Sequence, residues 1–212
     1  MTVAETRDLE TRERLLHAAT RLFAETGFGK VTVRDICERA NANVAAVNYH
    51  FGGKTGLYEQ VLESAIQIMQ ATTTLAREAG AGRPPEEQLR AYVRVFIQRI
   101  VARGDHSWIH QLMMHEMSDP TPALDLVVNQ VVKPRMDYLG GIVAALLQCA
   151  PSDRRVALCA MSVHAQCMAL MNARIAERVD PTLRVTPQGL DEIAGHITQF
   201  SLAGIRTMAT SA

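Results

Sequence analysis

Apolar positions recur at helical spacing through most of this chain. In the first predicted helix, from about Asp8 to Thr26, Leu15, Ala19 and Phe23 lie four residues apart and form one buried stripe. No segment alternates with the period of two that is typical of a strand. The pattern therefore predicts an all-α fold with about nine helices. Further helices are expected over residues 54–79, 86–103, 106–117 (a shorter one), 152–178 and 187–208, and one from 121 onward that Pro134 and Gly140-Gly141 should kink or break.

Residues 32–51 predict two short helices joined by a tight break. Thr32 and Asp35 have the spacing of a capping box, which marks the start of the first helix. The break is Asn41-Ala42-Asn43, after which Asn43 can cap the second helix. Val47 and Phe51 lie four residues apart and face the core. The opposite face of the second helix carries Val44, Ala45 and Asn48.

That outward face has the chemistry of a DNA-reading surface. Asparagine can pair with adenine through two hydrogen bonds, and a small apolar side chain can contact a thymine methyl group. Groups suited to phosphate surround it, and Lys54 opens the next helix, whose free amides attract anions. Three small helices of an ordinary core would show the same spacing. The predicted DNA-binding residues are Thr32, Arg34, Asn43, Val44, Ala45, Asn48, Tyr49, His50 and Lys54.

A family resemblance supports the DNA-binding interpretation. The wording LLHAATRLFAETGFGKVTVRDICERA followed by NVAAVNYHFGGKTGLY makes residues 9–69 similar to the DNA-binding domain of the TetR family of bacterial regulators. That family often has glycine where this chain has Asn41, and tyrosine where it has Asn48. The resemblance implies a helix-turn-helix head that binds operator DNA. The second stretch is similar to a branch of the family associated with responses to drugs and toxic compounds.

Composition limits the remaining classes. The 212 residues are 48% hydrophobic, and 22 basic side chains balance 22 acidic ones, so bulk charge gives no support for nucleic-acid binding. No signal segment and no apolar run of membrane-spanning length is visible. The four cysteines form no Cys-x-x-Cys pair, which favours reduced thiols in a cytoplasmic protein.

The stretch from Gly80 to Pro85 is the strongest candidate boundary in the sequence, because glycine and proline there interrupt the helical pattern. We therefore expect a DNA-binding domain over 9–69 and a second, helical domain over 83–209 that binds an effector and dimerises.

The last predicted helix combines large and small apolar residues at helical spacing, which suits close approach of another helix. Packing within one chain would give the same pattern. The family resemblance implies a homodimer formed through the last two long helices, with two heads on a near-palindromic operator. The predicted interface residues are Ile193, Ala194, Ile197, Phe200, Ser201, Gly204 and Ile205.

Two clusters of methionine, histidine and cysteine lie around residues 106–117 and 159–171. Sulfur and imidazole ligands can hold Cu(I) or Zn(II), although the spacings match no compact metal motif. An apolar lining for a small organic effector is the alternative that we adopt. Its predicted residues are Phe96, Trp108, His110, Met113, Met117, His164, Cys167 and Met168.

No catalytic motif is present. The chain has no Gly-rich phosphate loop, no nucleophile elbow and no His-Glu-x-x-His pair, and nothing in the sequence activates His164 and Cys167 as a nucleophilic pair. We expect a homodimeric repressor that needs no cofactor and leaves its operator when a small molecule binds. The alternatives are a regulator without an effector and a metal- or thiol-responsive sensor.

Overall fold

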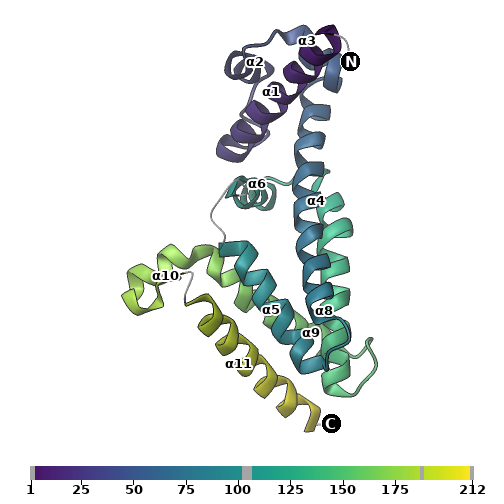
Figure 1. Ribbon diagram of the computed structural model, residues 1–212, viewed down its shortest axis with the longest axis vertical. Helices are drawn as coiled ribbons and strands as arrows, with labels where there is room; N and C mark the ends of the chain where they lie inside the picture. Colours follow the sequence, from purple (N-terminus) through teal and green to yellow (C-terminus); the bar gives the residue numbers. More distant parts are fainter. Residues whose placement is uncertain (1–2, 102–106, 187–188, 211–212) are drawn as a thin grey trace. The chain divides into compact units, whose positions relative to one another are not determined.

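The computed structural model describes residues 3–101, 107–186 and 189–210, which form helices and connecting turns without a strand (Figure 1). The predicted all-α class is confirmed. The chain divides into two compact units. Unit 1 comprises the described residues of Met1–Ile68 and Gly104–Val127, and unit 2 those of Met69–Arg103 and Val128–Ala212.

Unit 1 is built around the first helix. α1 packs against α2, α3 and α6, and its core side chains Leu15 and Phe23 are completely buried. The sequence pattern placed the start of this helix at about Asp8, but α1 begins at Val3. The helices of unit 1 are α1 (Val3–Thr26), α2 (Val33–Ala40), α3 (Val44–Phe51), the first part of α4 (Lys54–Gly80), α6 (Ser107–Ser118) and α7 (Leu124–Val127).

A buried carboxyl group fixes α6 inside unit 1. Glu116, on α6, accepts hydrogen bonds from the hydroxyl of Tyr58 on α4 and from the hydroxyl and the amide of Thr121. Tyr58 also packs edge-on against Phe23 of α1, with ring centroids 4.9 Å apart. Because both oxygens of Glu116 accept from protein donors, the carboxyl group is buried without an unpaired acceptor.

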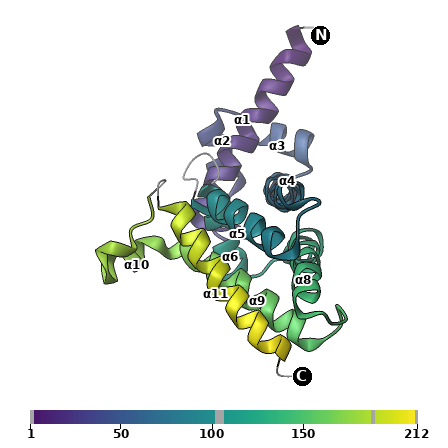
Figure 2. The same cartoon turned by 60° about the horizontal axis from the view of Figure 1, so that its bottom comes forward.

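Unit 2 is a helical bundle in which α5 is central. α5 packs against α8, α9 and α11, and Figures 1 and 2 both show α11 lying along α5 while α10 projects from the unit. Arg94 of α5 forms an ion pair with Asp191 of α11 at 2.9 Å. Besides the end of α4, the unit contains α5 (Pro85–Val101), the π-helix Val128–Val132, α8 (Lys133–Leu147), α9 (Arg154–Ala169), α10 (Ala173–Val179) and α11 (Leu190–Thr210).

The predicted helix over 152–178 is wrong, because the chain interrupts it. α9 ends at Ala169, a 3-10 turn follows over Leu170–Asn172, and α10 begins at Ala173. The 3-10 turn packs against α5. The break therefore comes from a tertiary contact, because the turn contains no glycine or proline. The helix also begins later than predicted: Asp153 caps it by accepting from the amide of Arg155 at 2.8 Å.

The predicted helix after Pro122 is also subdivided. The single turn α7 leads into the π-helix, and Pro134 lies in the first turn of α8. Gly140-Gly141, where a kink or break was expected, does not break the helix, since both glycines lie inside α8. The predicted helix ends at Arg103, His106 and Pro187 lie outside the described residues.

The compact units differ from the expected domains in two respects: unit 2 begins at Met69, inside α4 and ahead of Gly80–Pro85, and it does not contain α6 and α7. α6 and α7 were assigned to the second domain over 83–209, whereas the structure groups them with the N-terminal helices. Sequence order placed them after the Gly80–Pro85 boundary, but the chain returns to unit 1 after α5.

Candidate functional site

The start of each helix in the α2–α3 pair is set by a side-chain cap. The hydroxyl of Thr32 accepts from the amide of Asp35 at 3.2 Å, and the Asp35 carboxylate accepts from the amide of Thr32 at 2.9 Å. The hydrogen bonds that the Asp35 carboxylate accepts from the Thr32 hydroxyl and, to a smaller extent, from the Thr32 amide lower the pKa of Asp35. Asn43 caps α3 by accepting from the amide of Ala46 at 2.8 Å. The predicted caps are therefore present.

Two left-handed residues end these helices. Asn41 closes α2 with φ at 48°, and Gly52 closes α3 with φ at 69°. Asparagine is one of the few residues besides glycine that readily adopt this conformation, so Asn41 can fill a turn where related sequences often have glycine. Arg14 of α1 donates to the carbonyl of Ala40 at 3.1 Å and satisfies a free acceptor at the end of α2.

α3 divides into an anchored face and a free face. Val47 and Phe51 are buried, and the guanidinium of Arg12 lies 5.2 Å from the centre of the Phe51 ring. Four predicted base-contacting or phosphate-contacting residues are exposed on the other side; Tyr49 has 78% of its surface exposed. The exposed residues are Val44, Ala45, Asn48 and Tyr49.

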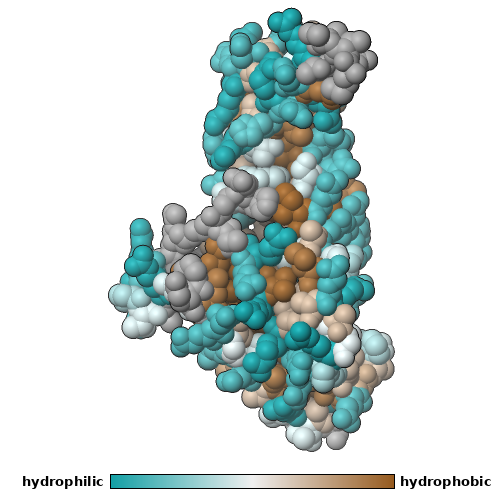
Figure 3. All heavy atoms as spheres, in the orientation of Figure 1, coloured by the Kyte–Doolittle hydropathy of each residue, from teal (hydrophilic) through white to brown (hydrophobic). Residues whose placement is uncertain are grey.

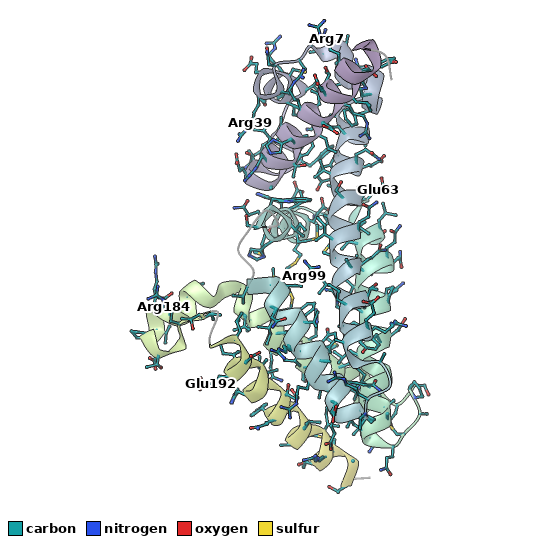
Figure 4. The ribbon with its side chains drawn as sticks, viewed as in Figure 1. Arg7, Arg39, Glu63, Arg99, Arg184 and Glu192 are labelled. Atoms are coloured by element: carbon teal, nitrogen blue, oxygen red, sulfur yellow. The ribbon has the colours of Figure 1, made fainter. Side chains whose placement is uncertain are left out.

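A shallow groove runs beside this free face. Its lining includes Arg7 and Thr11 of α1 together with Asn43, Ala45 and Tyr49. Figure 4 labels Arg7 near the beginning of α1, and Figure 3 shows a mostly hydrophilic surface over α1 and α2 in this view. No sequence pattern points to Arg7, because its place beside α3 depends on how α1 packs.

The residues predicted to contact phosphate differ in how exposed and how engaged their side chains are. Arg34 is exposed, and the ammonium group of Lys54 lies 4.3 Å from the centre of the Phe28 ring at the start of α4. The Thr32 hydroxyl is 2.7 Å from an Asp35 oxygen, so the cap already engages it. The His50 side chain is only 7% exposed, and its Nε2 lies 3.4 Å from an Asp8 oxygen.

The residues predicted to line an effector pocket are divided between the units. Trp108, His110, Met113 and Met117 lie on α6 of unit 1, where Met117 is largely exposed. His110 Nδ1 is buried there without a hydrogen-bond partner among the described residues. The other four residues lie in unit 2: Phe96, His164, Cys167 and Met168.

In unit 2 these residues form an aromatic cluster around His164. Its ring lies 5.0 Å from that of Phe96, and its Nδ1 is 3.1 Å from the hydroxyl of Tyr92, which sequence reasoning missed. Burial and the nearby charge of Arg135 lower the pKa of His164 to about 4. Burial raises the pKa of the Cys167 thiol to about 12, so both groups are neutral at physiological pH.

The described residues contain no group of three histidine, cysteine, aspartate or glutamate side chains close enough to hold a metal ion. Within those same ranges, no helix is long and apolar enough to cross a membrane.

α11 uses its apolar residues in two directions. Ala194, Ile197, Ser201 and Ile205 were predicted to form an intermolecular interface, but the structure buries them within their own chain. The correction has a simple cause, since α5, α8 and α9 cover that side of α11. Phe200 keeps 65% of its surface exposed, Gly204 is exposed, and Ile193 is half-buried.

A helix-turn-helix with an exposed second helix defines this chain as a DNA-binding transcriptional regulator. Residues 15–61 match the tetR family of bacterial regulatory proteins. Residues 85–205 match the C-terminal domain of the HTH-type transcriptional dual regulator CecR. The chain belongs to the TetR family and carries a C-terminal domain of the CecR type. Members of this family are regulators and not enzymes, and the same holds for this chain.

Individual relatives agree with this assignment. The chain is 29% identical over 157 residues to the dual regulator CecR of Shigella flexneri, covering 70% of each. It is 27% identical over 135 residues to a probable acrEF/envCD operon repressor of Escherichia coli K12, covering 61% of this chain and 57% of that one. A TetR-family regulator from Streptomyces coelicolor shares the fold, with a TM-score of 0.65, 23% identity and coverage of 93% and 96%.

Proposed function

We propose that the protein is a homodimeric repressor that acts in the cytoplasm and leaves a near-palindromic operator when a small organic effector binds. The observation that carries this proposal is the free face of α3, on which Asn48 lies one helical turn from the exposed Val44 and Ala45. This combination suits adenine and thymine edges in a major groove. Relatives described as a dual regulator and as a probable operon repressor support a role in transcription.

Exposed apolar side chains support the dimer. α9 and α11 pack against each other, and both carry large apolar residues on their open faces. Such faces are typical of surfaces that another protein covers. A two-fold dimer would present two copies of α3 to two half-sites of the operator. The exposed residues are Leu158, Met161, Phe200 and Met208.

Effector release needs an element that takes part in both functions. α4 is that element, because Lys54 opens it beside the DNA-reading helix and its last turns belong to unit 2. An effector bound in unit 2 would favour one position of α4 and thereby one spacing of the two α3 helices. Such coupling is reciprocal, so operator DNA would weaken effector binding by the same factor.

A gel-shift titration with the DNA upstream of the gene tests the central claim. We expect Asn48→Ala to lose about 1–3 kcal/mol on the specific site and little on random DNA, because it removes one base contact per half-site. Lys54→Ala should weaken binding to all sequences and reduce its salt dependence. Asn129→Ala, an exposed amide of unit 2, is the matched control. Equal losses on specific and random DNA for Asn48→Ala would disprove base reading by α3.

A further inference from the structure

Unit 2 buries an arginine in its interior. Arg135 of α8 is only 8% exposed. Its Nε donates to the hydroxyl of Thr73 at 3.3 Å, and its Nη2 donates to the carbonyl of Met69 at 3.0 Å. Both acceptors lie on the part of α4 that belongs to unit 2. The acceptors are neutral, so they hold the guanidinium in place without balancing its charge.

No carboxylate compensates Arg135 among the described residues. The ion pairs of unit 2 use other arginines, such as Arg94 with Asp191 and Arg155 with Asp153. A buried guanidinium without an opposite charge is costly, because desolvation is not repaid by an ionic contact. The lowered pKa of Arg135 has the same cause, burial. An unbalanced buried cation therefore needs an explanation beyond the tie between α8 and α4.

The surroundings of Arg135 are aromatic and neutral. The guanidinium carbon lies 4.7 Å from the centre of the Phe96 ring, which stacks on Tyr92 with centroids 5.6 Å apart. The His164 ring packs against the Phe96 ring, and because His164 is neutral it adds no second charge. Phe96 is 4% exposed and Tyr92 is completely buried, and Nη1 of Arg135 has no hydrogen-bond partner within the described part of the chain.

We infer that the effector carries an anionic group, a carboxylate on an aromatic or otherwise apolar body, which binds the free guanidinium edge of Arg135. This inference rests on the proposed function, since it names the chemical class of the effector. A carboxylate can accept from a guanidinium through charge-assisted hydrogen bonds, which are about twice as strong as neutral ones. The apolar body would lie against the Phe96 side of the cluster, where His164 can orient a polar substituent.

Calorimetry on the full chain with matched pairs of compounds tests this inference. The probes are benzoate, 2-naphthoate and decanoate, each compared with its uncharged primary amide. We expect at least one carboxylate to bind wild type about tenfold more tightly than its amide. A hydrogen bond to a charged group contributes enough free energy for a difference of this size. In Arg135→Gln the preference should fall to about one, because the amide side chain keeps hydrogen bonds and loses the charge.

Arg77 offers a matched control. Its guanidinium also lies on an aromatic ring, 5.0 Å from the centre of Tyr138, but the side chain is exposed. Arg77→Gln should keep the full preference for the carboxylate. Arg135→Lys should keep part of it, and this variant also decides the question if Arg135→Gln does not fold. Equal binding of every pair to wild type, or a preference that persists in Arg135→Gln, would overturn the inference.

A gel shift in the presence of each pair separates the two proposals. Amides that release the operator as well as carboxylates do would uphold effector release and contradict the anionic effector. A carboxylate that binds through Arg135 and leaves operator affinity unchanged would uphold the anion site and contradict effector release.

Discussion

The two units bury their ionisable groups in different ways. Glu116 in unit 1 is 1% exposed and accepts from Tyr58 and from both donors of Thr121. Arg135 in unit 2 is almost as deeply buried, yet its partners are one hydroxyl and one carbonyl, and Nη1 has no hydrogen-bond partner among the described residues. Glu116 therefore has a donor for each of its oxygens, whereas the hydrogen bonds that Arg135 makes within the described residues go to neutral groups only.

The same contrast holds for apolar surface. The exposed face of α3 in unit 1 combines small and polar side chains, whereas α9 and α11 in unit 2 expose large apolar ones. Among its described residues, unit 2 has no carboxylate paired with Arg135, and α9 and α11 expose large apolar side chains, a feature typical of surfaces that another molecule covers. We propose that other molecules complete unit 2, namely a second copy of the chain and an anionic effector.

The largest effect is expected from Phe200→Glu. An unpaired charge in a packed apolar interface is strongly unfavourable, so the variant should be monomeric and should lose tight operator binding. Light scattering would show the change in mass. Gln199→Glu places a charge one residue away on an exposed polar position and should remain dimeric. A dimeric Phe200→Glu protein with normal operator binding would place the interface elsewhere.

Removing Glu116 tests whether unit 1 depends on its internal network. Glu116→Ala leaves the buried Tyr58 hydroxyl without an acceptor and opens a cavity, so unfolding free energy should fall by about 3–4 kcal/mol. Glu116→Gln keeps the volume and an acceptor and should cost about 1 kcal/mol. Urea denaturation measures both, with the exposed Glu59→Ala as control. Equal losses for Ala and Gln would mean that the charge matters more than the hydrogen bonds.

A smaller effect is expected from the titration of His164 in unit 2. Its pKa is about 4 in the folded chain against an ordinary value of 6.5, so the unfolded chain holds more protons between these values. Stability should therefore fall as the pH is lowered from 6.5 to 4, by about 2–3 kcal/mol.

In His164→Gln this loss should disappear, while Tyr92 keeps a polar neighbour. The difference between variant and wild type cancels the carboxylates that titrate in the same range. Exposed His17→Gln should behave like wild type. An unchanged pH dependence in His164→Gln would show that folding does not lower the pKa of His164.

Local chemistry explains why the DNA-binding helices could be predicted. Thr32 with Asp35 and Asn43 are caps that act within four residues, and Val47 and Phe51 share a face through helical periodicity alone. Such signals need no knowledge of distant residues. The same reasoning failed at Leu170–Asn172, where helix-forming residues continue but packing against α5 imposes a 3-10 turn.

By itself, the sequence determined the all-α class, the α2–α3 turn, the exposed face around Asn48 and the family of the chain. Only the tertiary structure decided which neighbour covers each apolar stripe, so that Ile197 and Ile205 face their own chain while Phe200 does not. It also decided that Glu116 and Arg135 are buried, although both are ordinary charged residues in the sequence. The physical reason is that periodicity shows which residues share a face, whereas burial depends on segments far apart in the chain.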